Sequence, residues 1–179
     1  MNVIIDTEFT DLSKHPAFIS VGLISLDGKN SFYAELIDNY STQNCSEFVH
    51  ENVLPLLDAD LLSDTLDYKN IYAKMTTAQC RTHLSIWISL FEEPVQIWSD
   101  ASYYDWVFIK ELFSVDFWPV NLLGLPKWIF SDDQNEIDRY KNIREVLYAS
   151  GVFRRHHALH DARVTLQAFL SVNTIHIDS

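Results

Sequence analysis

Hydrophobic residues in the first forty positions occur in short runs that are separated by turn signals. The β-branched run of residues 3–5 is followed directly by an acidic residue, and such a run predicts a strand that is buried on both faces. A second run covers residues 17–26, Asp27 and Gly28 form a hairpin signal, and a third run covers residues 31–37. The chain is therefore predicted to open with a three-stranded meander.

From residue 46 onward, hydrophobic residues recur mainly at helical spacing. Residues 46–57 predict a short helix that stops near its proline, because proline cannot continue a helix. A longer helix is predicted over residues 76–93, where Thr76 and Gln79 have the spacing of a capping box. Residues 58–75 follow neither period, and we expect them to form an irregular excursion.

The remaining hydrophobic runs predict short strands and helices in turn. They indicate a strand over residues 94–98, a helix over 102–113, an extended piece over 125–130, a helix over 133–151 that ends at Gly151, and a helix over 159–170. No internal repeat, low-complexity tract or linker divides the chain, so one domain is expected over residues 1–179. Antiparallel strands followed by αβ units predict an α/β fold with a central mixed sheet flanked by helices.

Composition and charge narrow the possible partners. Hydrophobic residues make up 47% of the 179 residues, and the 4 glycines and 5 prolines are few, which is typical of a compact globular protein. The formal net charge is −12. A protein that binds nucleic acid by broad neutralisation of phosphates is normally basic, so any nucleic-acid contact here must be local or bridged by metal ions.

Cysteine usage and the amino terminus bear on the cellular compartment. Cys45 and Cys80 are far apart and form no CxxC pair, which favours a reducing cytosol. The amino terminus has no basic region before its apolar run, so no signal peptide is expected. No stretch approaches the ~20 apolar residues of a membrane span. We therefore expect a soluble, cytoplasmic protein without a membrane partner.

Two carboxylates end the first predicted strand. Asp6 and Glu8 are two residues apart, and the period of a strand directs both side chains to the same face. Like charges so placed repel each other, and a divalent cation would remove that repulsion. Alternatively, the strand has already ended and both side chains are solvated.

Two further aspartates head helices. Asp105, Ile109 and Leu112 share one face of the helix over residues 102–113, although Ser102 and Asp105 also have the spacing of a capping box, which spacing alone favours. Asp161 lies in the first turn of the last helix, where the helix dipole favours an acid in any case. The small residues Ala158, Thr165 and Ala168 share the strip of Asp161 and allow a close neighbour.

Taken together, these residues form a more specific pattern than any of them alone. The segments "IIDTEF", "SDASYYDWVF" and "HHALHDAR" combine D-x-E on the first strand, an aspartate opening a mid-chain helix, and H-x-A-x-x-D at the last helix. This pattern resembles that of the DEDDh, or DnaQ-like, 3′–5′ exonucleases, which have an RNase H-like fold. The segments "ISVGLISLDG", "FYAELI", "VLPLL" and "LPKW" are similar to the small stand-alone bacterial and phage exoribonucleases of that superfamily. The resemblance covers most of the chain and is weakest over residues 58–75.

The resemblance implies an activity and a set of ligands. It implies that Asp6, Glu8, Asp105 and Asp161 hold two divalent cations, Mg²⁺ or Mn²⁺, for which hard oxygen ligands are suited. Such a pair of ions can clamp the attacking and leaving oxygens while water cleaves the terminal phosphodiester and releases a nucleoside 5′-monophosphate. The subgroup implies RNA rather than DNA as substrate and a homodimer as the assembly.

The resemblance also requires a histidine as general base, and three histidines lie in the segment 156–160. Helical spacing alone favours His157, which is four residues before Asp161. The family places its histidine in a loop five residues before the aspartate, with alanine two residues after it, and His156 meets both conditions. The pair His156 and His160 has zinc-binding spacing on a helix, but no glutamate follows the first histidine. We assign the base to His156 and expect His157 and His160 to be solvated or near substrate phosphate.

Neighbouring residues are candidates for substrate contacts. Thr7 and Phe9 flank the acidic pair, where relatives hold the terminal nucleotide. Tyr104 could stack on a base, or equally be a core aromatic. Arg154 and Arg155 precede the histidines and could contact the phosphate backbone, or form a solvated basic pair.

Two other classes of function compete with the exonuclease. One is a catalytically inactive module of the same fold that binds a nucleic-acid end or a protein, and retention of every motif residue argues against it. The other is an endonuclease of the RNase H kind, against which the H-x-A-x-x-D segment speaks. We therefore expect a metal-dependent 3′–5′ exonuclease acting on RNA or DNA 3′ ends.

Overall fold

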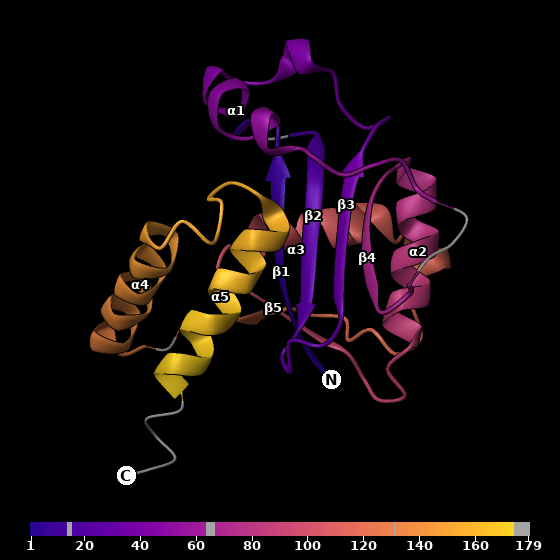
Figure 1. Cartoon of the computed structure of the whole chain (residues 1–179). Coiled ribbons are helices and arrows are strands. Elements are labelled where there is room, and N and C mark those ends of the chain that lie inside the picture. The colour runs from indigo at the N-terminus through magenta and orange to yellow at the C-terminus, as the bar shows by residue number, and fades with distance from the viewer. Residues whose placement is uncertain (14–15, 64–66, 131, 174–179) are drawn as a thin grey trace.

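A mixed six-stranded sheet forms the centre of the protein (Figure 1). The computed structural model describes residues 1–13, 16–63, 67–130 and 132–173. The sheet has the strand order β4-β3-β2-β1-β5-β6; β1 pairs with β2 and β2 with β3 in antiparallel fashion, and the other pairs are parallel. The strands are β1 (Asn2–Phe9), β2 (Phe18–Ser25), β3 (Ser31–Leu36), β4 (Asn70–Met75), β5 (Gln96–Ser99) and β6 (Lys127–Trp128).

Helices cover both faces of this sheet. They are α1 (Glu47–Asn52), α2 (Thr77–Ser89), α3 (Ser102–Leu112), α4 (Gln134–Ala149) and α5 (Ala158–Asn173), with short 3₁₀ turns η1 (Thr42–Asn44), η2 (Leu54–Leu56) and η3 (Val115–Phe117). Helices α2 and α3 share one apolar core with the sheet, whereas α4 and α5 form a second core on the opposite face (Figure 1). The predicted α/β architecture with a mixed sheet is confirmed. No helix in the described ranges combines the length and the apolar character needed to cross a lipid bilayer.

The alternation of side chains along β1 decides which way its carboxylates face. Val3 and Ile5 pack in the core formed with α2 and α3, whereas Ile4 packs in the core formed with α4 and α5. Because side chains alternate along a strand, Asp6 and Glu8 continue the face of Ile4, and the intervening Thr7 lies on the other face. The strand runs through Phe9, so the prediction that both acids share one face is confirmed, and the reading in which the strand has already ended is wrong.

Helix α5 sits close to the sheet because one strand residue has no side chain. A β-carbon added to Gly22 of β2 would lie 2.3 Å from the backbone nitrogen of Leu159 and 2.5 Å from the carbonyl oxygen of Ala158. The small residue predicted at Ala158 therefore meets a glycine across the interface. This contact fixes the first turn of α5 above the middle of the sheet.

Sequence and structure disagree most over residues 58–75. We predicted an irregular excursion there, but Asn70–Met75 is the strand β4, which pairs in parallel with β3 at the edge of the sheet. The strand was missed because its period-2 pattern is carried only by Ile71, Ala73 and Met75, and its outward residues include asparagine and lysine, which are poor strand formers. Residues 64–66 of this segment lie outside the described ranges.

The other predicted elements are found within a few residues of their expected bounds. The capping box of Thr76 and Gln79 is formed at the start of α2. Gly151 follows the end of α4 in the left-handed conformation, with φ of 74°, as expected of a glycine that terminates a helix.

Candidate active site

The carboxylates that the sequence singled out meet in one cavity. The cavity has a volume of about 390 Å³, and Asp6 and Glu8 from β1, Asp105 from α3 and Asp161 from α5 all line it together with His156. Three segments that are distant in sequence therefore supply acidic oxygen atoms to one place, as the resemblance implied.

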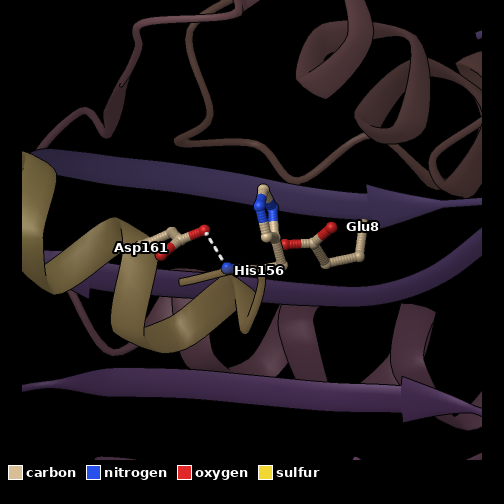
Figure 2. Close-up of side chains that lie close together, drawn as sticks. All are labelled: Glu8, His156 and Asp161. Atoms are coloured by element: carbon tan, nitrogen blue, oxygen red, sulfur yellow. Dashed lines mark hydrogen bonds between the residues drawn. The ribbon is translucent and has the colours of Figure 1, made fainter. Parts of the chain in front are cut away.

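Three of these residues are close enough to share one ion. Ligand atoms of Glu8, His156 and Asp161 all lie within 4.8 Å of one another, and Figure 2 shows their side chains converging from β1, the loop before α5, and α5. This cluster could hold a metal ion. Its two carboxylates are hard oxygen ligands, whereas the imidazole is a ligand for many metals.

Asp105 is held by two hydroxyl groups at the floor of the cavity. The Thr7 hydroxyl donates to Oδ1 over 2.7 Å, and the Ser99 hydroxyl donates to Oδ2. Burial raises the pKa of the Asp105 carboxyl to about 7, and these hydrogen bonds counteract the rise. The capping-box reading of Asp105 is wrong, because α3 begins at Ser102 and its N-cap is Ala101.

Asp161 is oriented by donors on both of its oxygen atoms. The Tyr148 hydroxyl donates to Oδ1 over 2.7 Å, and the backbone N–H of His156 donates to Oδ2 over 2.9 Å. Burial raises the pKa of this carboxyl to about 6 in spite of these hydrogen bonds. The second contact fixes the loop before α5 to the first turn of the helix.

Asp6 and Glu8 lie at the cavity among other acidic side chains. Removal from bulk water raises the pKa of Asp6 well above its ordinary value, and the charges of Asp161, Glu8, Asp105 and Asp100 raise it further. Glu8 is affected in the same way by burial and then by Asp161 and Asp105. Every influence on these two groups opposes ionisation, so a divalent cation fits this donor set because it would compensate the negative charge.

His156 has an unusual backbone conformation. Its φ is 65°, in the left-handed region, where it is the only non-glycine residue among the described ones. The imidazole meets the ring of Phe48 edge-on, with 4.9 Å between the ring centroids. Burial, and then the nearby arginines 155 and 144, lower the pKa of this histidine. The structure thus puts His156 in a loop beside the carboxylates, as the spacing rule required.

The other two histidines of the segment are placed differently from our prediction. His157 is 2% exposed and stacks on Tyr33, with ring centroids 4.5 Å apart, so it is neither solvated nor beside the carboxylates. His160 accepts the backbone N–H of Arg154 at Nδ1 over 3.0 Å. The helical zinc pair is also wrong, because α5 begins at Ala158 and His156 precedes it.

Of the residues predicted to contact substrate, Thr7, Phe9 and Arg155 line the cavity, and Tyr104 is not among its lining residues. Thr7 and Phe9 line the cavity, but the Thr7 hydroxyl is used to hold Asp105. Tyr104 stacks on Phe9, with 5.1 Å between ring centroids. Arg155 lines the cavity and makes two 2.7 Å hydrogen bonds to the carboxylate of Glu145.

Arg154 is likewise paired, through a 2.7 Å ion pair with Asp58. The basic pair is therefore not free in this arrangement.

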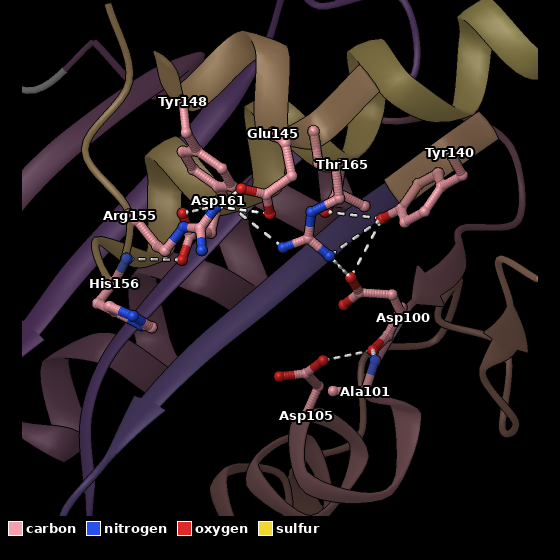
Figure 3. A network of polar contacts seen from close by, with 12 residues as sticks. Asp100, Ala101, Asp105, Tyr140, Glu145, Tyr148, Arg155, His156, Asp161 and Thr165 are labelled. Atoms are coloured by element: carbon pink, nitrogen blue, oxygen red, sulfur yellow. Dashed lines mark hydrogen bonds and ion pairs between the residues drawn. The ribbon is translucent and has the colours of Figure 1, made fainter. Parts of the chain in front are cut away.

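A polar network on one wall of the cavity was not predicted (Figure 3). Asp100 follows β5 directly and forms an ion pair with Arg144 of α4, whose guanidinium also donates to the Tyr148 hydroxyl over 3.3 Å. The Tyr140 hydroxyl lies 3.1 Å from Asp100 and 3.2 Å from Thr165. Because β5 is parallel to β1, an acid after β5 must lie near the acids that end β1, and this topological signal could have revealed Asp100.

An apolar cavity adjoins the carboxylates. It has a volume of about 340 Å³ and shares Glu8, Phe9 and His156 with the first cavity. Its remaining walls are mostly hydrophobic side chains from the loop after β1 and from α1, among them Leu12, Phe48, Val49 and Val53. Acidic and apolar surfaces of nucleotide size are thus placed side by side.

Comparison of the whole chain with models of known protein families and with curated proteins gives no match. The chemistry of the site is therefore the basis for a functional assignment.

Proposed function

We propose that this protein is a metal-dependent 3′–5′ exonuclease of the DEDDh type with an RNase H-like fold. The reaction would release nucleoside 5′-monophosphates from the 3′ end of a nucleic acid. The observation that carries the proposal is the convergence of four carboxylates and one histidine, all singled out by motif spacing, on a single cavity. A purely structural role does not explain why four carboxylates whose pKa values are all raised are gathered in one cavity.

Asp6, Glu8, Asp105 and Asp161 would hold two divalent cations, Mg²⁺ or Mn²⁺. When bound, such ions stabilise charge on the attacking and leaving oxygens of phosphoryl transfer. The chain itself orients the ligands: Thr7 and Ser99 hold Asp105, and Tyr148 and the His156 backbone hold Asp161. Such outer contacts fix the direction of each carboxylate before the ions arrive.

His156 would accept the proton of the attacking water. Its pKa is lowered from the ordinary value of about 6.5, so the imidazole is neutral and able to accept a proton at neutral pH. Its closeness to Glu8 and Asp161 supports this role. His157 is buried against Tyr33 and is not among the residues that line the cavity, which supports His156 as the base.

The substrate would be held locally rather than by a broad basic surface. The net charge of −12 disfavours general binding of a polyanion, and the apolar cavity beside Glu8 offers room for the sugar and base of a terminal nucleotide. Contacts of this kind do not read sequence, because stacking tolerates any base. We favour RNA over DNA, on the resemblance to exoribonucleases.

The test is degradation of matched 5′-labelled RNA and DNA oligonucleotides in the presence of Mg²⁺, Mn²⁺ or EDTA. We expect a ladder that shortens from the 3′ end, requires metal, and is lost in Asp6→Asn, whose fold is retained because the change relieves carboxylate repulsion. Asp116→Asn, an exposed acid on η3 that lines none of the cavities described above, is the matched control and should behave as wild type.

Two results would redirect the assignment. Full activity of Asp6→Asn would contradict the two-metal site. Binding of labelled oligonucleotides without shortening, under every metal condition, would favour the inactive binding module instead.

A further inference from the structure

A partly buried aromatic cluster lies next to the candidate base in the chain, with Tyr33 and His157 buried and Tyr72 41% exposed. His157 packs against tyrosines of two adjacent strands: its ring centroid is 4.5 Å from that of Tyr33 on β3 and 6.1 Å from that of Tyr72 on β4, with interplanar angles of 19° and 17°. We call Tyr33, Asp58, Tyr72, Arg154 and His157 the His157 cluster. None of its members lines the catalytic cavity.

The hydrogen bonds of the cluster define which nitrogen of His157 carries the proton. The Tyr72 hydroxyl contacts His157 Nε2 at 3.0 Å and also contacts Asp58 Oδ1. A carboxylate cannot donate, so the single hydroxyl proton goes to Asp58 and His157 must donate from Nε2. Arg154 donates to the other Asp58 oxygen over 2.7 Å and keeps that carboxylate ionised, which lowers the pKa of Asp58 to about 2.

This arrangement makes His157 the N-cap of α5. With the proton on Nε2, Nδ1 is a free acceptor, and it lies 3.5 Å from the backbone N–H of His160, while the His157 carbonyl accepts the N–H of Asp161 over 2.9 Å. A side chain that accepts an orphan N–H is how capping residues stabilise a helix start. The capped turn is the one that carries Asp161.

The residue before His157 has a backbone conformation that must be stabilised by contacts with other parts of the chain. The left-handed φ of 65° at His156 is sterically unfavourable for a residue with a β-carbon. Asp161 Oδ2 accepts its N–H on one side. On the other side the chain is anchored through His157, which the tyrosines 33 and 72 hold in the cluster.

We propose that Tyr72 is a positioning residue for His156. By accepting a hydrogen bond from His157 and donating one to Asp58, its hydroxyl ties the loop before α5 to strand β4 and keeps the His156 imidazole facing Glu8 and Asp161. The catalytic consequence rests on the proposed function, but the positioning itself can be observed without any activity.

The experiment compares Tyr72→Phe with Tyr33→Phe. Both changes delete one hydroxyl and keep a ring against His157, but Tyr33 donates to Glu35 and not to the histidine. The first readout is nitrogen NMR of the His157 side chain, which reports its tautomer, together with the proton contact between the rings of His156 and Phe48. The second is kcat and KM.

We expect Tyr72→Phe to lose the uniform Nε2-protonated form of His157 and to weaken the contact between His156 and Phe48, while Tyr33→Phe keeps both. We also expect kcat to fall about 10-fold in Tyr72→Phe with KM unchanged, since an outer contact that orients a reacting group has an effect of about this size. Tyr33→Phe should retain the wild-type kcat.

The outcomes separate this proposal from the proposed function. Wild-type protein without nuclease activity would reject the exonuclease, while loss of the His156–Phe48 contact in Tyr72→Phe alone would still support the positioning. An unchanged NMR signature in Tyr72→Phe, or an equal loss of kcat in both variants, would overturn the role of Tyr72 whether or not the protein is an exonuclease.

Discussion

At the scale of single residues, His156 combines a demanding conformation with a demanding position. Non-glycine residues rarely adopt a left-handed φ, and one that does so beside a cluster of carboxylates is strained where chemistry is expected. The N–H of His156 is bonded to Asp161, so the strain and the orientation of a proposed metal ligand depend on each other. A substitution that relieves the backbone strain but removes the imidazole should therefore affect stability and activity differently.

We predict that His156→Gly is more stable than His156→Ala by about 1 kcal/mol, because glycine adopts a positive φ without a steric penalty. Both variants lose the imidazole and its contact with Phe48, so the comparison isolates the backbone. Urea unfolding at neutral pH measures the difference, and both variants should lack exonuclease activity. Equal stability of the two would mean that the loop is not held in the left-handed conformation in solution.

At the scale of secondary-structure elements, the seating of α5 on β2 determines the geometry of the site. The helix carries Asp161 in its first turn, and that turn packs backbone against backbone at Gly22. The atoms that a new side chain would meet belong to the main chain and cannot rotate away. Any added volume must therefore displace the helix start.

We predict that Gly22→Ala lowers the free energy of unfolding by about 2–3 kcal/mol, the cost of forcing an extra methyl group into a packed interface. It should also weaken Mn²⁺ binding, because the displaced turn takes Asp161 away from Glu8. Gly124→Ala is the matched control, since a β-carbon there meets nothing within 4 Å. Wild-type metal affinity in Gly22→Ala would show that α5 does not set the site.

Only some of the elements that build the site could be predicted from the sequence. D-x-E was predictable because strand alternation is a local rule, and β1 obeys it. The strand β4 was not, since a short edge strand with polar outward residues has a weak pattern and is stabilised by pairing with β3, a contact that is distant in sequence. The role of Tyr72 on that strand was hidden for the same reason.

At the scale of the whole molecule, four acidic side chains are gathered in one cavity, where burial opposes their ionisation. Asp105 and Asp161 have pKa values raised to about 7 and about 6, and those of Asp6 and Glu8 are raised as well. The folded protein therefore holds protons that the unfolded chain releases near pH 4. The contribution of these groups to stability is present below about pH 4 and is lost as pH rises through 6 to 7.

We predict that the stabilisation provided by Mn²⁺ increases as pH rises from 5 to 7.5. The ion binds ionised carboxylates and compensates the repulsion that ionisation creates. The measurement is the difference between the unfolding midpoints with Mn²⁺ and with EDTA at each pH. Titration of histidines outside the site shifts both midpoints, so its contribution largely cancels in this difference. In Asp6→Asn the pH-dependent increase should be reduced, and a difference independent of pH in wild type would contradict a carboxylate site.

The sequence by itself determined the order of most elements and the common face of Asp6 and Glu8, because both follow from local periodicity, which one chain displays directly. The four carboxylates and His156 were singled out as a set by the resemblance to the DEDDh pattern, whereas spacing alone favoured His157. Only the tertiary structure decided that Asp105 is held by Thr7 and Ser99, that the ion pair of Asp100 and Arg144 lines the cavity, and that His157 is buried. Those facts depend on contacts between residues far apart in the chain, which exist only after the sheet has brought β1, β4, β5 and the helices together.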